Sequence, residues 1–193
     1  MTFSPRDAYF QKAKREGYLA RSVYKLQAID AKYRLFHPGQ RIVDLGAAPG
    51  SWSQYILQRC AGRVEILAVD RMPLRIEAPG LRFLEADIFS PIVEAAIEEH
   101  SWDGVVSDAA PATTGASPTD QARSAALVER SLYLAAKGLR SGGFWVAKLL
   151  EGPARKELEK SAKALFQEVH TFRPPATRKG STECFLIGLR RRL

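Results

Sequence analysis

The stretch Arg41-Ile-Val-Asp44-Leu-Gly46-Ala-Ala-Pro49-Gly50-Ser-Trp52 carries the pattern that decides the fold. An apolar run ends in Asp44, a turn of small residues spans Gly46 to Gly50, and a helical pattern covers residues 51–59. Strand, tight turn and helix start in this order are typical of a nucleotide-binding α/β fold. The two glycines carry no Cβ, so we expect the backbone of the turn to approach a ligand closely.

The spacing of this turn favours a nucleoside ligand that has no pyrophosphate. Its glycines are spaced Gly-x-x-x-Gly, whereas dinucleotide-binding turns use Gly-x-Gly-x-x-Gly. Pro49 also removes one of the backbone N–H donors that would hold a pyrophosphate. The cofactor that we predict is S-adenosylmethionine. The alternatives are a plain strand-to-helix turn without a ligand and a nicotinamide-dependent dehydrogenase.

Length and composition indicate one soluble domain. The chain has 193 residues, of which 46% are hydrophobic and 26% charged, values that suit a globular domain with a sizeable core. It contains no apolar run of about 18 residues that could span a membrane, and its start lacks the apolar stretch of a signal peptide. Cys60 and Cys184 are too few for a disulfide framework or a metal site. We therefore expect a cytoplasmic monomer without a metal, in which a basic helical extension (1–38) precedes a catalytic α/β core (39–193).

The positive charge is concentrated at the two ends of the chain. The net charge is +8; residues 1–41 hold nine Lys/Arg against three acids, and residues 171–193 hold six against one. The middle of the chain holds 14 Lys/Arg against 17 acids. If the two ends meet, they form a positive surface suited to a polyanion such as RNA. Solubilising charge on two separate exposed segments is the alternative.

Hydrophobic periodicity predicts an alternation of strands and helices. The predicted strands are 42–45, 64–69, 81–84, 104–107, 144–149, 169–172 and 184–189, and the predicted helices are 7–16, 22–33 with Ser22 as N-cap, 51–59, 92–99, 121–139 and 153–166. Such alternation predicts a Rossmann-like, mostly parallel seven-stranded sheet flanked by helices. A short link joins the last two strands, so one of them is expected to run antiparallel. The loop 109–119 is long enough to be functional.

Acidic residues follow several of the predicted strands. Asp44, Asp70 and Asp108 end three strands, and Asp87 comes shortly after a fourth. In an open parallel sheet, ligands bind beyond the carboxyl ends of the strands. Asp70 lies 20 residues past Gly50, the offset at which an acid binds ribose hydroxyls. Asp87 could accept a hydrogen bond from an adenine amino group.

Several motifs together resemble one family over nearly the whole chain. They are Ser22-Val-Tyr-Lys25-Leu, Asp44-Leu-Gly-Ala-Ala-Pro-Gly-Ser-Trp-Ser-Gln54, Ser107-Asp-Ala-Ala-Pro111, Val146-Ala-Lys148-Leu and Ser181-Thr-Glu183. The combination is similar to the FtsJ (RrmJ-type) ribose 2′-O-methyltransferases. One departure is visible, because the family's Pro-Gly-Gly-Trp is Pro-Gly-Ser-Trp here; Ser51 is expected to act as a helix cap.

The resemblance implies a catalytic tetrad and a set of cofactor-binding residues. The family's Lys–Asp–Lys–Glu tetrad falls on Lys25, Asp108, Lys148 and Glu183. Its cofactor-binding residues fall on Gly50, Trp52, Asp70, Asp87 and Asp108, to which the glycine turn adds Asp44 and Gly46. A 2′-hydroxyl is a poor nucleophile until it loses its proton. Lys148 could accept that proton if burial and a neighbouring cation lower its pKa.

The resemblance also implies a substrate. The chain shows about one domain and no appended module, which resembles the bacterial form that methylates a uridine in the A-loop of 23S ribosomal RNA on the large ribosomal subunit. A 2′-O-methyltransferase acting on transfer RNA or another RNA remains an alternative. A non-catalytic RNA-binding protein with a vestigial cofactor fold is another.

Overall fold

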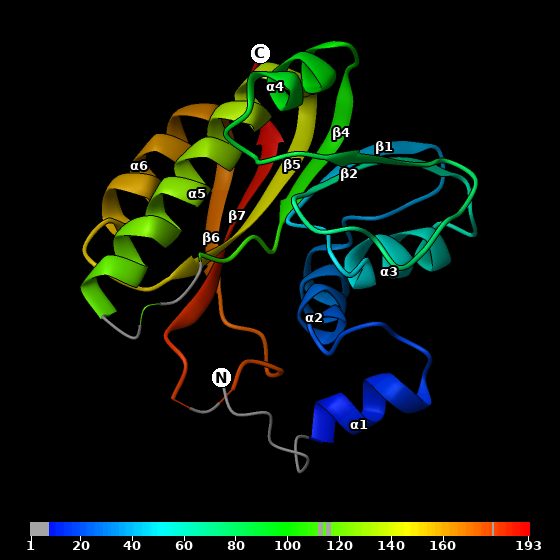
Figure 1. Ribbon diagram of the computed structural model, residues 1–193. Helices are drawn as coiled ribbons and strands as arrows, with labels where there is room; N and C mark the ends of the chain where they lie inside the picture. Colours follow the sequence, from blue (N-terminus) through cyan, green and yellow to red (C-terminus); the bar gives the residue numbers. More distant parts are fainter. Residues whose placement is uncertain (1–7, 112–113, 115–116, 179) are drawn as a thin grey trace.

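A seven-stranded sheet forms the centre of the protein. The computed structural model describes residues 8–111, 114, 117–178 and 180–193. The strands run in the order β3-β2-β1-β4-β5-β7-β6 (Figure 1). Their bounds are β1 Gln40–Leu45, β2 Val64–Asp70, β3 Leu81–Glu85, β4 Trp102–Ser107, β5 Leu139–Leu150, β6 Phe166–Phe172 and β7 Glu183–Arg191. Strand β7 pairs antiparallel with both of its neighbours, β5 and β6, and the other neighbouring strands pair in parallel, which confirms the predicted fold.

Helices cover both faces of the sheet. They are α1 Ala8–Arg15, α2 Val23–Tyr33, α3 Ser51–Arg59, α4 Pro91–Glu98, α5 Ser117–Gly138 and α6 Arg155–Leu165. Val43 and Leu45 of β1 belong to the core beneath α4, α5 and α6, whereas Ile42 belongs to the core beneath α2 and α3 (Figure 1). Because both faces are covered, the central strands are continuous apolar runs. None of the helices in the described part of the chain is long and apolar enough to cross a membrane.

Several predicted boundaries differ from those of the structure. Helix α5 begins at Ser117, so the loop expected to run to Thr119 ends earlier. Strand β5 begins at Leu139 rather than Phe144, because Gly142-Gly143 interrupts the apolar pattern at a register shift opposite β4. Strand β6 begins directly after α6, at Phe166. The predicted start of the first helix, residue 7, lies outside the described residues.

The two serines expected to cap helices bind each other instead. Ser22 precedes α2, but its φ of −60° and ψ of −21° are helical and its side chain makes no cap hydrogen bond. A capping side chain needs an extended backbone at this position. The Ser22 hydroxyl lies 3.0 Å from the Ser51 hydroxyl, and Gly50 occupies the N-cap of α3. Both capping predictions are wrong; the serine pair joins the start of α2 to the start of α3.

The basic ends of the chain meet only in part. Arg21 donates a hydrogen bond of 2.6 Å to the carbonyl of Ala176, which lies between β6 and β7. Ala176 also packs in a small core with Ala13, Val23 and Tyr24. The arginines at 190–192 lie at the opposite end of β7, near the C-terminus (Figure 1). The two ends therefore meet at the β6–β7 link, whereas the last three arginines lie away from this contact; the shared positive surface stays a prediction.

Candidate active site

A cavity opens at the carboxyl ends of β1, β2 and β4. Its volume is about 520 Å³, within the usual range for small-molecule sites. The lining residues are Gly46, Ala48, Val69, Asp70, Arg71, Ala86, Asp87, Ile88, Phe89, Asp108, Ala109, Ala110, Pro111, Arg123, Ala126 and Leu127. Three acids of the predicted strand ends thus face one cavity. The topology brings them together because β2, β3 and β4, which precede these acids, are parallel strands that end at the same edge of the sheet.

The carboxylates of the cavity also hold its walls in place. Asp70 accepts hydrogen bonds from the backbone N–H of Ala48, at 3.0 Å, and of Met72, at 2.9 Å. Asp87 accepts one from the N–H of Phe89, at 3.0 Å. The Phe89 side chain is 52% exposed although it lines the cavity. Sequence reasoning missed Phe89; the only signal for it was an apolar residue two places after a strand-end acid.

The glycines of the turn serve the protein's own packing. Gly46 has a φ of +73°, and a Cβ added to it would lie 2.6 Å from the Cα of Ala109. Gly50 has a φ of +114°, and a Cβ there would lie 3.0 Å from the side chain of Ile76. Both glycines therefore make room for neighbouring segments; their close approach to a ligand stays a prediction. Gly46 lines the cavity, whereas Gly50 is not among the lining residues.

Two further predicted cofactor residues lie behind the cavity wall. Asp44 is fully buried and accepts a hydrogen bond of 2.7 Å from the Ser53 hydroxyl. Trp52 is 2% exposed, and its ring centroid lies 5.9 Å from that of Phe185. Its indole N–H donates to the carbonyl of Ser22. Neither Asp44 nor Trp52 lines the cavity; Asp44 is bound to Ser53 of α3, and Trp52 connects α3 to Ser22 and Phe185.

The buried Asp44 predicts a pH-dependent stability. Its pKa is raised to about 7, chiefly by burial and also by the nearby carboxylates of Asp108 and Asp70, against the lowering effect of hydrogen bonds from Ser53. An unfolded chain would have a value of about 4. Between these two values the folded protein binds more protons than the unfolded chain, so the free energy of unfolding falls as the pH rises. We expect Asp44→Asn to remove this slope. From pH 4 to pH 8, the free energy of unfolding of the variant minus that of the native protein should therefore rise by a few kcal/mol (~1.4 per pKa unit).

Denaturant unfolding across this pH range measures the effect. Asparagine keeps an oxygen that can accept the hydrogen bond from Ser53, so the difference between the two proteins reports the ionisation. Parallel stability curves for the two proteins would show that Asp44 does not titrate in this window.

Two ion pairs join largely buried side chains, and one of them includes Asp108 of the cavity lining. The Lys148 Nζ lies 2.9 Å from the Asp108 carboxylate, and it also donates a hydrogen bond to the Asp108 carbonyl. The Lys25 Nζ lies 2.6 Å from the Glu183 carboxylate. All four side chains are 16% exposed or less. The four residues of the predicted tetrad are thus paired as lysine with carboxylate, and Asp108 also faces the cavity.

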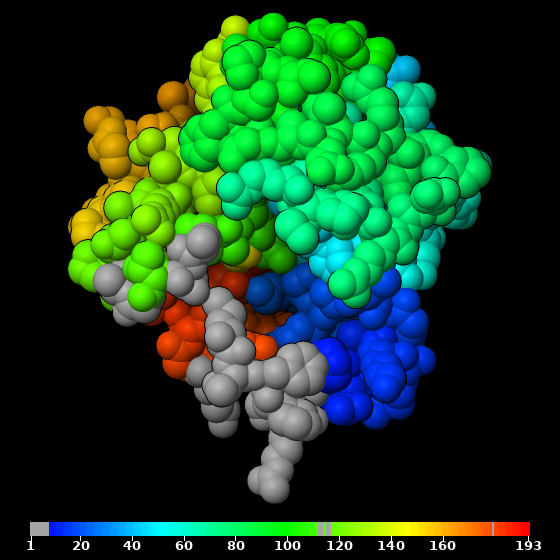
Figure 2. Space-filling model, viewed as in Figure 1, coloured from blue at the N-terminus to red at the C-terminus, as the bar shows by residue number. Residues whose placement is uncertain are grey.

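The register of β5 and β7 explains how the two pairs come together. Lys148 lies opposite Phe185, and Leu150 lies opposite Glu183. Lys148 and Glu183 are therefore diagonal neighbours on one face, about 7–8 Å apart at the backbone. On that face of the sheet, Phe185 belongs to the same core as residues of α2. Helix α2 also carries Lys25, the partner of Glu183. In Figure 2 a hollow lies where the N-terminal, central and C-terminal segments (blue, green and orange-red) meet.

Comparison with known proteins finds relatives along the whole chain. The family model described as FtsJ-like methyltransferase matches residues 18–191. Ribosomal RNA large subunit methyltransferase E of Bdellovibrio bacteriovorus is 43% identical over 193 residues, which are 98% of this chain and 98% of that protein. The protein of the same name from Syntrophobacter fumaroxidans is 42% identical, and the match covers 100% of this chain and 99% of that protein.

Solved structures share the same fold. A protein of Plasmodium falciparum described as a ribosomal RNA methyltransferase has a TM-score of 0.79 at 25% identity, over 90% of this chain and 98% of its own. Human Methyltransferase-like protein 13, solved in complex with SAH, has a TM-score of 0.61 at 14% identity; the match covers 86% of this chain and 81% of that protein. The second likeness concerns the fold alone. The family model matches a range that includes all four residues of the ion pairs, and the two relatives are more than 40% identical over nearly the full length. This chain therefore belongs to the FtsJ-like methyltransferase family.

Proposed function

We propose that this protein transfers the methyl group of S-adenosylmethionine to a ribose 2′-hydroxyl of RNA. The target is a uridine in the A-loop of 23S ribosomal RNA, within the large ribosomal subunit, and the protein acts as a cytoplasmic monomer. One observation carries the proposal: two largely buried lysine–carboxylate pairs include the diagonal neighbours Lys148 and Glu183 of β5 and β7, and one of the pairs shares Asp108 with the cavity. The names of the relatives support ribosomal RNA as the substrate.

The cavity fits the proposed cofactor chemically. Asp70 and Asp87 offer acceptors for the ribose hydroxyls and the adenine amino group, and Phe89 offers an apolar surface for the base. Carboxylates also suit a positively charged sulfonium compound. When it is bound, the cofactor supplies an activated methyl group. Asp108 would connect the cofactor site to Lys148, because its carboxylate lies in contact with both.

The ion pairs supply the proton chemistry. Lys148 gives up the proton of its ammonium group to solvent and then, as the neutral amine, accepts the proton of the 2′-hydroxyl. Asp108 fixes the direction of its nitrogen through both the carboxylate and the carbonyl. Lys25 and Glu183 hold the hydroxyl in line with the methyl group, and this positioning lowers the barrier. The low exposure of the four side chains restricts their motion and limits access of water to the reacting oxygen.

Replacement of Asp70 tests the cofactor assignment. We expect Asp70→Ala to weaken the binding of S-adenosylmethionine, because it removes an acceptor from the cavity and frees the backbone N–H groups of Ala48 and Met72. Calorimetric titration measures the dissociation constant, with the exposed Glu85 of β3 replaced by alanine as the matched control. An unchanged constant in Asp70→Ala would remove Asp70 from the cofactor site.

Salt dependence tests the contact with RNA. Affinity for RNA is expected to fall steeply with salt, since phosphate contacts release counterions. Lys14 and Arg15 are exposed on α1, whereas Lys12 pairs with Glu16 and lies over the Tyr24 ring, so reversal of its charge would also disturb packing.

We therefore expect the double variant Lys14→Glu/Arg15→Glu to weaken RNA binding and to flatten the salt slope by about one unit per lost contact. Binding of the cofactor should not change. The control reverses Lys156 and Lys163, which are exposed on α6 at the other face of the sheet. Equal losses in both double variants would mean that net charge, and not a surface on α1, determines RNA affinity.

A further inference from the structure

Three aromatic rings and a lysine gather where the end of α2 contacts the edge strand β6. The ring centroid of Tyr33, the last residue of α2, lies 5.3 Å from that of His170 and 6.1 Å from that of Phe172. The Lys32 Nζ lies 4.6 Å from the Phe172 centroid and 5.3 Å from the Tyr33 centroid. His170 and Phe172 are two residues apart on β6, so they lie on the same face of the sheet. These four residues form the aromatic cluster.

Part of the aromatic cluster faces solvent. Lys32 is exposed, and the His170 side chain is 42% exposed, with Glu168 at 3.4 Å from its ring nitrogen. Tyr33 and Phe172 are half-buried and pack against the core beneath α2 and α3. Within the described part of the chain, Lys32 forms no ion pair. Packing in the core explains why Tyr33 and Phe172 are aromatic, but it gives no role to Lys32 and His170.

The register of the sheet places the aromatic cluster beside the two lysine–carboxylate pairs. Phe185 of β7 lies opposite Lys148 in one neighbouring strand and opposite Phe172 in the other. Neighbouring strands lie about 4.8 Å apart, so about 10 Å separate the backbones of Lys148 and Phe172. On α2, Lys32 follows Lys25 by seven residues, which is about two turns, or ~10 Å along the same side of the helix. A stacked strand advances ~3.4 Å per nucleotide, so about three nucleotides span this distance.

Aromatic rings beside a cation suit an unpaired nucleotide. The faces of nucleobases stack on aromatic side chains, and proteins that bind single-stranded RNA use this contact widely. An ammonium group over a ring at an exposed site is held weakly, so a base can displace Lys32 from the rings of Tyr33 and Phe172. The flexible lysine side chain can then bind a phosphate. An apolar protein surface would instead have to desolvate the charge of Lys32, so the cluster favours RNA over a hydrophobic partner.

We propose that the aromatic cluster is a stacking site for an unpaired nucleotide within about three positions of the methylated one. Tyr33, His170 and Phe172 provide the rings, and Lys32 binds the phosphate. This inference rests on the proposed function and adds positioning residues to it. A base held at this site fixes the direction in which the RNA leaves the reacting ribose. Because stacking is tolerant of base identity, the contact selects an unpaired segment and not a sequence.

Removal of single bases from the RNA tests the stacking site. We would measure the affinity of a fluorescent A-loop hairpin in which each nucleotide within three positions of the target uridine is replaced in turn by an abasic nucleotide. With the native protein, one of these changes should weaken binding about fivefold to 100-fold, the range for a base stacked on an aromatic side chain. Tyr33→Leu and His170→Ala should each weaken binding of the intact hairpin and should lose much of the response to that abasic change.

Controls separate stacking from general effects. His100 is exposed and packs on Trp102 at the amino end of β4, so His100→Ala is the matched control and should bind all the hairpins as the native protein does. His170→Phe keeps a ring and should retain the response to the abasic change. Lys32→Gln should lower the salt slope by about one unit. The affinity for S-adenosylmethionine, measured on the same proteins, should be unchanged and reports that each variant is folded.

The response to the abasic changes decides the outcome. Equal responses of the native, Tyr33→Leu and His170→Ala proteins to every abasic change would overturn the inference, and so would a native protein that responds to none of them. An altered oligomeric state of His170→Ala with unaltered responses would assign the cluster to a contact between copies of the chain and would also overturn it. Methyl transfer to large ribosomal subunits is measured separately, and its absence in the native protein would contradict the proposed function instead.

Discussion

Replacement of Lys148 by alanine is expected to lower the rate of methyl transfer by a factor on the order of 10²–10⁴, the usual contribution of a positioned acid–base group. The residue lies at the end of a central strand, 9% exposed, with its Nζ held by Asp108. Its removal leaves no group in its place to accept the proton. Cofactor affinity should change little, because the acids that line the cavity remain. Single-turnover assays with labelled cofactor measure the rate.

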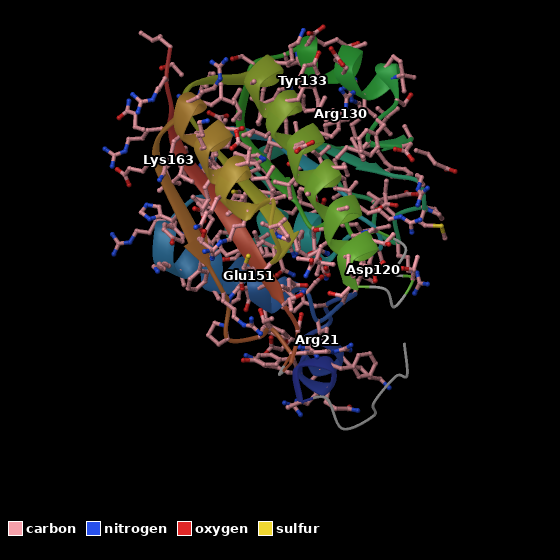
Figure 3. All side chains as sticks on the ribbon, turned by 90° about the vertical axis from the view of Figure 1, so that its left-hand side faces the viewer. Arg21, Asp120, Arg130, Tyr133, Glu151 and Lys163 are labelled. Carbon is pink, nitrogen blue, oxygen red and sulfur yellow. The ribbon has the colours of Figure 1, made fainter. Side chains whose placement is uncertain are left out.

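Lys148→Arg is the sharper variant. Arginine keeps the positive charge but does not deprotonate at working pH, so this variant should be as inactive as Lys148→Ala. Lys163, which is exposed on α6 (Figure 3), provides the matched control, and its replacement by alanine or arginine should leave the rate unchanged. Near-full activity of a folded Lys148→Arg would show that the lysine acts by charge or position, and Asp108 or a water would then have to accept the proton.

Gly46→Ala should have the second large effect, on both stability and activity. The backbone at Gly46 has a φ of +73°, which costs an L-residue about 1–2 kcal/mol. The new Cβ would also meet the backbone of Ala109 at 2.6 Å, which adds roughly 1–3 kcal/mol of overpacking. Any relief moves Ala109 and with it Asp108, so catalysis should fall together with stability.

Gly62→Ala is the matched control for the backbone conformation. Gly62 has a φ of +71°, and a Cβ there would meet nothing within 4 Å. This variant should lose only the conformational part of the stability and should keep full activity. Denaturant unfolding and the methyl-transfer rate are measured on both variants. Equal destabilisation of the two would show that the contact with Ala109 carries no energy.

The sequence was sufficient to predict the parts of the fold that depend on local pattern. The apolar runs that end in Asp44, Asp70 and Asp108 are strands, and their ends lie at one edge of the sheet. Asp70, Asp87 and Asp108 face one cavity because the parallel strands that precede them end at that edge, whereas Asp44 does not line the cavity. The antiparallel strand followed from a short link that leaves no room for a crossover helix. The tetrad residues came from the resemblance, and the register of β5 with β7 explains their proximity.

Features that depend on contacts between distant segments could not be predicted. Ser22 and Ser51 each have a side chain typical of a cap, but their hydroxyls meet across two helices that only the fold brings together. Trp52 and Asp44 belong to the motif, yet the direction of their side chains from α3 and β1 places them behind the cavity. The arginines at 190–192 are close in sequence to Arg178, but the length of β7 carries them to the far end of the sheet.

Mapping of the transferred methyl group tests the central claim most directly. Large ribosomal subunits that lack this modification are incubated with the protein and labelled S-adenosylmethionine, and the labelled nucleotide is then located by nuclease digestion and mass spectrometry. We predict one methyl group on the ribose 2′-oxygen of a uridine in the A-loop of 23S ribosomal RNA, present with native protein and absent with Lys148→Arg. A methyl group on a base, or no transfer to RNA while the cofactor binds, would contradict the proposed function.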